Sequence, residues 1–313
     1  MKIGRTILLL GTIAVLTAGV CIAQTRFGSG FRRGWGSHDG PIVRTEGGDF
    51  VNEDTVRTAR EVPQHGRNEE GGISVTPNWT NAAGFEKDVF TYARIVYKMN
   101  DLPAPVELGW VNDYPDSDLN LSFRLQQLTS MKVDPNGRVL KLTSPDLFDY
   151  PWIFMAQPGH MELRDEEVPI LRKYLLNGGV LMVDDFWGDA EWQSFETEMK
   201  RVLPERHWVE LPMDHPIFHC VFDLKMAKND LQVQTKNFWR RGGITHRGRT
   251  DTADFHVRAW LDDKQRIMVI ALHNTDTGDG WEREGESVDY FQTFSETRAY
   301  PLGINIIFYL MTH

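Results

Sequence analysis

The segment LRDEEVPILRKYLLNGGVLMVDD, residues 163–185, decides the fold of this chain. Its first part predicts an amphipathic helix, because acidic residues fill the first turn and Leu171 and Leu175 share one face. Gly178 is typical of a helix stop. The apolar run GVLMVDD follows without polar alternation. Such a run after a helix is typical of a strand that is buried on both faces of a sheet.

Strand and helix signals continue to alternate on both sides of this segment. Strands are expected over residues 90–98, from Arg138 and over residues 152–160, and helices from Asp116, from Glu191 and from Pro301. Two β-rich runs near the end predict a hairpin that turns at residues 262–265. Alternation of this kind predicts an α/β domain, which we place at residues 85–313.

The first 23 residues have the layout of a secretory signal peptide. A basic start at Lys2 and Arg5 precedes an apolar stretch from Ile7 to Val20, with small residues near Ala23. The mature protein is then expected to be exported, either periplasmic or extracellular. The alternative is an uncleaved anchor, in which case the leader would make the only membrane contact.

Residues 24–84 differ in composition from the rest of the chain. They are rich in Gly, Arg, Asn, Glu and Thr and show no sustained periodicity, which predicts a flexible linker. The whole chain has a formal net charge of −10, and an acidic surface repels phosphates. A nucleic-acid partner is therefore not expected.

Several polar residues follow directly after apolar strands, where open α/β sheets bind their ligands. The candidates for catalysis are Asp113, His160, Asp184, Asp185 and His215. Carboxylates and imidazoles can act as acid and base, or hold a divalent metal, for which Asp113, Asp184, Asp185 and His215 are the candidate ligands. Their spacing matches no known metal motif.

The same residues also have a purely structural interpretation. Asp116 and Asp118 are natural helix caps, Asp184 and Asp185 could cap the loop before Trp187, and a His after Pro-Gly is often a turn residue. Cys220 lies in the apolar run IFHCVF, which favours a buried small side chain over a nucleophile. Four tryptophans could stack on sugar rings, although core packing explains most tryptophans: Trp187, Trp192, Trp239 and Trp281.

The order of several motifs resembles a known family. FTYARIVY, WVNDYPDSDLNLSFRLQQLT, LFDYPWIFMAQPGH, LRKYLLNGGVLMVDDFWG, DHPIF and LGINIIFYLMT are similar to the bacterial family catalogued as domain of unknown function 4159, over residues 90–312. The resemblance implies a class I glutamine amidotransferase-like fold, related to trehalose-utilisation-type domains. That fold is a flavodoxin-like three-layer sandwich with a mostly parallel central sheet.

The resemblance also bears on function. Amidotransferases of this type carry a nucleophilic cysteine on a sharp turn after a buried strand, and here the matching place after GGVLMV holds Asp184 and Asp185. Relatives often accompany von Willebrand-type domains and MoxR-type ATPases in envelope-associated assemblies, which implies a protein partner. The first hypothesis is therefore an exported, non-catalytic binding or assembly domain. The second is a metal-assisted or carbohydrate-directed hydrolase that uses the five candidate residues.

Overall fold

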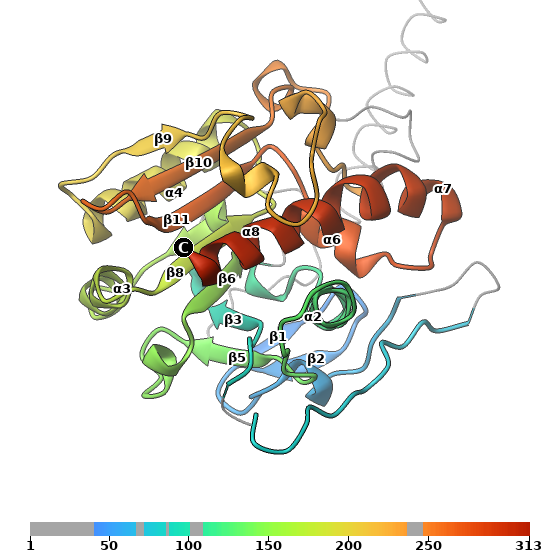
Figure 1. Cartoon of the computed structure of the whole chain (residues 1–313). Helices are drawn as coiled ribbons and strands as arrows, with labels where there is room; N and C mark the ends of the chain where they lie inside the picture. Colours follow the sequence, from blue (N-terminus) through green and yellow to red (C-terminus); the bar gives the residue numbers. More distant parts are fainter. Residues whose placement is uncertain (1–40, 67–71, 86–87, 101–108, 237–246) are drawn as a thin grey trace, which may run out of the picture. The chain divides into compact units, whose positions relative to one another are not determined.

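A seven-stranded β-sheet forms the centre of the protein in this computed structural model, which describes residues 41–66, 72–85, 88–100, 109–236 and 247–313 (Figure 1). The signal peptide expected over residues 1–23 lies outside these ranges. Across the sheet, the strands are β5 (Arg138–Lys141), β3 (Ala93–Val96), β6 (Trp152–Ala156), β8 (Val180–Asp184), β11 (Ile267–His273), β10 (His256–Leu261) and β9 (Trp208–Glu210). The prediction of an α/β fold with a mostly parallel sheet is confirmed.

The strand order identifies the edge at which sheets of this kind bind ligands. Strands β5, β3, β6, β8 and β11 run parallel. On one side the sheet is extended by β10, which pairs antiparallel with β11, and by β9, which pairs antiparallel with β10. Numbered along the chain, the five parallel strands take the order 2-1-3-4-5, which is the order of flavodoxin-like folds. Ligands in such sheets bind beyond the carboxyl ends of the strands, near the point where the strand order reverses. Here that point lies between β3 and β6.

Helices cover both faces of the sheet (Figure 1). On one face, α3 (Glu167–Leu176) and α4 (Gly188–Val202) pack on the core side chains of alternate strand positions. On the other face lie α2 (Asp116–Leu128), α6 (Thr277–Glu282) and α8 (Tyr300–Thr312), the last preceded by α7 (Val288–Tyr290) and the π-helix η8 (Phe291–Ala299). Among the described helices, none has the length and apolar character to cross a bilayer.

The elements expected from periodicity are present, with two shorter strands. The first expected strand divides into β3 and β4 (Lys98–Met99), and β4 pairs with β7 (Met161–Glu162) outside the main sheet. The strand expected over residues 152–160 ends as β6, because Gln157 takes a left-handed conformation (φ 49°) before the 3₁₀ turn η4 (Pro158–His160). The hairpin of β10 and β11 is confirmed.

The described part of the expected linker is folded, which corrects the prediction for residues 24–84. Strands β1 (Ile42–Arg44) and β2 (Phe50–Asn52) pair as a hairpin, followed by the 3₁₀ turn η1 (Ala59–Glu61). Val51 and Val56 lie in the same core cluster as the sheet. Composition alone misses this fold, because a few buried apolar residues are enough to order the segment when main-chain and polar contacts with the α/β domain supply the remaining stabilisation.

Asp116 makes one of those contacts and does not cap its helix. Its carboxylate accepts hydrogen bonds from the main-chain N–H groups of His65 (3.0 Å) and Gly66 (3.1 Å) and from the Gln64 amide (3.2 Å). The first position before α2 is Pro115, and no side chain caps the helix there. The capping role expected for Asp116 is therefore wrong, since its donors come from the segment about fifty residues earlier.

Asp118, the other expected cap, forms a buried ion pair with Arg94 on β3. The guanidinium Nε lies 3.0 Å from both carboxylate oxygens of Asp118. The four remaining N–H groups donate to Asp118 Oδ1 (2.5 Å), to Ser117 Oγ (2.9 Å) and to the carbonyls of Trp110 (2.9 Å) and Asn112 (3.0 Å). Because every donor has a partner, this charge is tolerated in the core and fixes the loop between β3 and α2.

Replacing Asp118 by Asn tests this role. The Asp118→Asn variant leaves the Arg94 charge buried without its counter-charge, so we expect the free energy of unfolding to fall by about 3 to 5 kcal/mol. Urea unfolding measures the change. The exposed residue Asp149 provides the matched control, since Asp149→Asn should change the stability by less than about 0.5 kcal/mol. Equal stability of the two variants would contradict the assignment.

Candidate functional site

Left-handed residues mark the carboxyl edge of the sheet. Asp113, Gln157, Asp185 and Asn274 have φ angles of 58°, 49°, 56° and 63°. They follow β3, β6, β8 and β11, the four neighbouring parallel strands. A side chain in this conformation costs about 1 to 2 kcal/mol, and such strain gathers at functional sites. The edge is therefore the first place to examine for function.

The Asp185 carboxylate is held by donors on both oxygens. Asn112 Nδ2 and Gln157 Nε2 each donate to Oδ2 at 3.0 Å. Trp187 Nε1 donates to Oδ1 at 2.7 Å, and the Arg247 guanidinium, stacked on the Trp187 ring, lies 3.5 Å from the same oxygen. A carboxylate bound in this way is an anchored negative charge that organises the loops around it.

Asp184, which precedes Asp185 in the sequence, is fully buried, and within the described ranges only one of its two carboxylate oxygens has hydrogen-bond donors. Its Oδ2 accepts hydrogen bonds from Thr277 Oγ1 and from the main-chain N–H of Gly278 (2.9 Å). Its Oδ1 has no hydrogen-bond partner among the described residues. Burial raises the pKa of Asp184 to about 7, with the Asp185 charge adding to the rise and the bond from Thr277 opposing it. This carboxyl group can therefore exchange a proton near neutral pH.

Gly278, whose N–H group binds Asp184, also lies next to Asp113. A Cβ atom at Gly278 would come within 2.2 Å of Asp113 Oδ2, so only glycine leaves room for this carboxylate. Asp113 is 4% exposed, and its carboxylate accepts no hydrogen bond from the described residues. Burial raises its pKa well above the usual value, and the charges of Asp279 and Asp185 raise it further, against the effect of Arg283.

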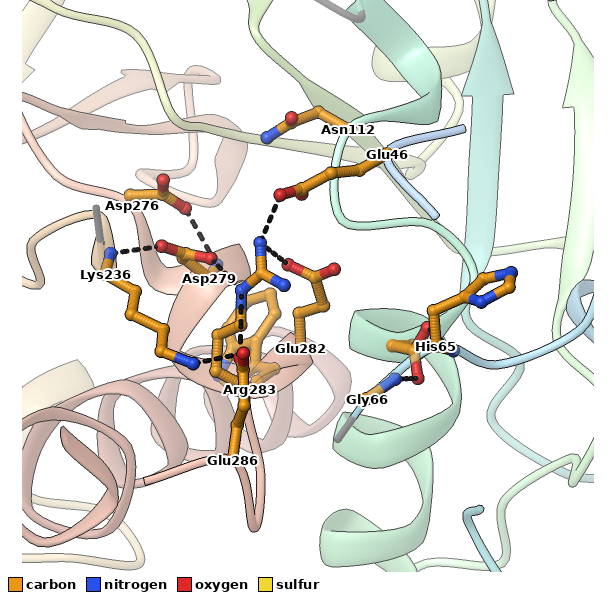
Figure 2. Close-up of polar contacts among 12 residues, drawn as sticks. Glu46, His65, Gly66, Asn112, Lys236, Asp276, Asp279, Glu282, Arg283 and Glu286 are labelled. Atoms are coloured by element: carbon orange, nitrogen blue, oxygen red, sulfur yellow. Dashed lines mark hydrogen bonds and ion pairs between the residues drawn. The ribbon is translucent and has the colours of Figure 1, made fainter. Parts of the chain in front are cut away.

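Arg283 is the centre of a second group of carboxylates (Figure 2). Its guanidinium donates to Asp279 (2.8 Å) and Glu46 (2.5 Å) and lies 3.0 Å from Glu282 and 3.6 Å from Glu286. These residues come from α6, from the loop after it and from the turn between β1 and β2. One cation therefore holds the N-terminal hairpin against the carboxyl edge.

Negative charge exceeds positive charge in this network, which we call the acidic cluster. Within the described ranges it contains eight carboxyl groups and three cations: Glu46, Asp113, Asp184, Asp185, Asp276, Asp279, Glu282 and Glu286, with Lys236, Arg247 and Arg283. Burial raises the pKa of Asp276 and of Glu282. The excess must be offset by bound protons or by a bound cation.

The acidic cluster includes three of the five predicted site residues. Asp113, Asp184 and Asp185 come together as the strand ends predict. His160 lies at the same edge in η4, where its main-chain N–H donates to Gln157 O (3.0 Å). The structure places His215 elsewhere, at the start of η5 (Pro216–Phe218), with its ring 5.4 Å from that of Tyr309.

Sequence reasoning missed most of the cluster. Asp276, Asp279 and Glu282 follow β11 as Asp185 follows β8, so the pattern of acids after a buried strand could have revealed them. Glu46 gave no such signal, because it lies in a polar segment without periodicity. Its place in the cluster depends on the folding of the hairpin.

Other candidate groups turn out to be structural. The Cys220 thiol contacts the carbonyl of Asn305 (3.2 Å), and burial raises its pKa. Trp187, Trp192 and Trp281 are buried, so they are core side chains and do not offer a face to a sugar. Trp239 lies outside the described residues.

The fold and the site together define a flavodoxin-like α/β domain with a buried acidic cluster at the carboxyl edge of its sheet. Residues 91–311 match the family described as "Domain of unknown function (DUF4159)", so the chain belongs to that family. A comparison with curated proteins found no match.

The raised pKa of Asp184 predicts a pH dependence of stability. An acid with a raised pKa in the folded state stabilises the fold fully below its unfolded pKa of about 3.9, and this contribution is lost as the pH rises through about 7. Between about pH 5 and pH 8, we expect the free energy of unfolding to fall by about 2 to 3 kcal/mol more in the wild type than in Asp184→Asn. Urea unfolding at both pH values, with Asp149→Asn as the control, measures the difference. Parallel pH profiles would contradict the assignment.

Proposed function

We propose that the chain is a non-catalytic binding domain of an exported assembly and that the acidic cluster is its binding centre. The observation that carries the proposal is the state of Asp185. It occupies the sharp left-handed turn after a buried strand, where the amidotransferase-like resemblance places a nucleophilic cysteine. Both of its oxygens are bound by donors, so it supplies an anchored charge and not a free nucleophile.

The strand order supports descent from an amidotransferase-like ancestor. The order 2-1-3-4-5 and the strand-to-helix turn at Asp185 agree with that superfamily. Cys220, the sole cysteine among the described residues, follows η5 and belongs to a different part of the fold. Loss of the thiol from the turn leaves a fold that can bind a ligand without glutamine hydrolysis.

The chemistry of the cluster indicates the kind of ligand. An excess of buried carboxylates attracts a cationic group, either a metal ion or a basic side chain of a protein partner. The expected signal peptide at residues 1–23 would place the domain in the envelope or outside the cell. The net charge of −10 argues against a nucleic-acid ligand.

A second candidate function is a metal-assisted or carbohydrate-directed hydrolase. Asp184 favours it, because its pKa of about 7 suits a general acid or base at neutral pH. The unpartnered Oδ1 of Asp184 would be the atom that exchanges the proton. The buried tryptophans weigh against the carbohydrate form of this hypothesis.

A panel of hydrolysis assays distinguishes the two functions. The purified full chain is incubated with glutamine and with aryl esters, phosphates and glycosides, with EDTA or with added Mg²⁺, Mn²⁺ or Zn²⁺. We expect no turnover above that of the Asp184→Asn variant, because both oxygens of Asp185 are held by donors and this residue is not a free nucleophile. Turnover by the wild type and by Asp149→Asn, but not by Asp184→Asn, would establish the hydrolase instead.

A further inference from the structure

We propose that Glu46, Asp113 and Glu282 bind a hard divalent cation, with Ca²⁺ as the best fit. This inference rests on the proposed function in taking the acidic cluster as the binding centre. The three residues each offer one oxygen, and these oxygens lie within 4.8 Å of one another. Two ligands on opposite sides of a Ca²⁺ ion, each about 2.4 Å from it, are separated by about the same distance.

The ligand atoms select the class of metal. All three are carboxylate oxygens, and oxygen ligands are preferred by Ca²⁺, Mg²⁺ and Mn²⁺ over softer metals. Ca²⁺ accepts irregular sets of six to eight oxygens, whereas Mg²⁺ requires a near-ideal octahedron at shorter distances. Water and the second oxygens of the carboxylates would complete the shell.

Asp113 provides the independent observation. It is 4% exposed, its carboxylate has no hydrogen-bond donor among the described residues, and Gly278 leaves the space that it fills. Glu46 and Glu282 are already ion-paired with Arg283. An unpartnered carboxylate taken out of water is costly, and a cation at this place would remove the cost.

The resident Arg283 does not balance the group. Arg283 and Lys236 are ion-paired with four carboxylates: Glu46, Asp279, Glu282 and Glu286. Asp113 adds a fifth, since one of its oxygens lies within 4.8 Å of those of Glu46 and Glu282. A divalent ion would offset most of the remaining negative charge. The divalent ion would bind Glu46 and Glu282 together with the Arg283 guanidinium, or it would displace the guanidinium from them.

The site has a route to solvent and a structural consequence. Glu46 is 36% exposed at the turn of the β1–β2 hairpin, so an ion can enter from that side. Asp113 comes from the loop after β3, and Glu282 comes from α6. A bound ion would therefore link three segments that are distant in the sequence, and it should stabilise the folded state.

Calorimetric titration of the EDTA-stripped full chain with Ca²⁺, Mg²⁺ and Mn²⁺ tests the proposal, together with thermal unfolding. We expect one-to-one binding of Ca²⁺ and a rise in Tm with its concentration. Asp113→Asn and Glu282→Gln should each weaken binding at least tenfold, whereas the exposed controls Asp149→Asn and Glu166→Gln should bind as the wild type does. Absence of binding by all three metals, or unchanged affinity in Asp113→Asn, would overturn the proposal.

The Arg283→Gln variant provides a second test. Removal of the resident guanidinium should lower Tm in EDTA, and Ca²⁺ should restore it by a larger shift than in the wild type. A variant that is destabilised but not rescued by Ca²⁺ would count against the site. If Arg283→Gln does not fold, the more exposed Glu46→Gln variant carries the comparison, with an expected tenfold loss of affinity.

The two proposals fail in different ways. Turnover of a substrate would refute the non-catalytic domain whether or not the metal binds. Failure of every metal to bind, without turnover, would refute the cation site alone and leave a basic side chain of a partner as the ligand of the acidic cluster.

Discussion

The buried pair of Arg94 and Asp118 is the interaction on which the rest of the site depends. It joins β3 to α2, and the same guanidinium holds the carbonyls of Trp110 and Asn112. These hydrogen bonds to the two carbonyls fix the loop in which Asp113 takes its left-handed conformation. A charge that would be costly alone in the core is thus used to position a second charge at the edge of the sheet.

The acidic edge contains carboxylates in two different states. Asp185 is surrounded by amide, indole and guanidinium donors, which hold both of its carboxylate oxygens in place. Asp113 and one oxygen of Asp184 are buried without donors, which disfavours ionisation and raises the pKa of both groups. The first state gives the loops a rigid frame. The carboxyl groups in the second state can take up a proton or a cation. This difference between the two states is the reason to regard the edge as a candidate binding site.

The sequence predicted the elements better than it predicted the contacts. Periodicity located α2, α3, α4, α8 and the β10–β11 hairpin, because those signals are local. Strand ends also located Asp113, Asp184 and Asp185. The partners of Asp116 and Asp118 were missed, because their donors lie about fifty and twenty-four residues earlier and a helix cap is the default local interpretation. Glu46 was out of reach for the same reason: a polar segment acquires its role only when it folds against the body.

The β1–β2 hairpin, at the N-terminal end of the described residues, extends the folded domain beyond the residues that match the family. The family match begins at residue 91, yet Val51 and Val56 complete the core, and Gln64 to Gly66 satisfy the buried carboxylate of Asp116. A fragment cut at the match boundary would expose apolar surface and leave that carboxylate without its donors. The region that matches the family and the region that folds together are therefore of different lengths.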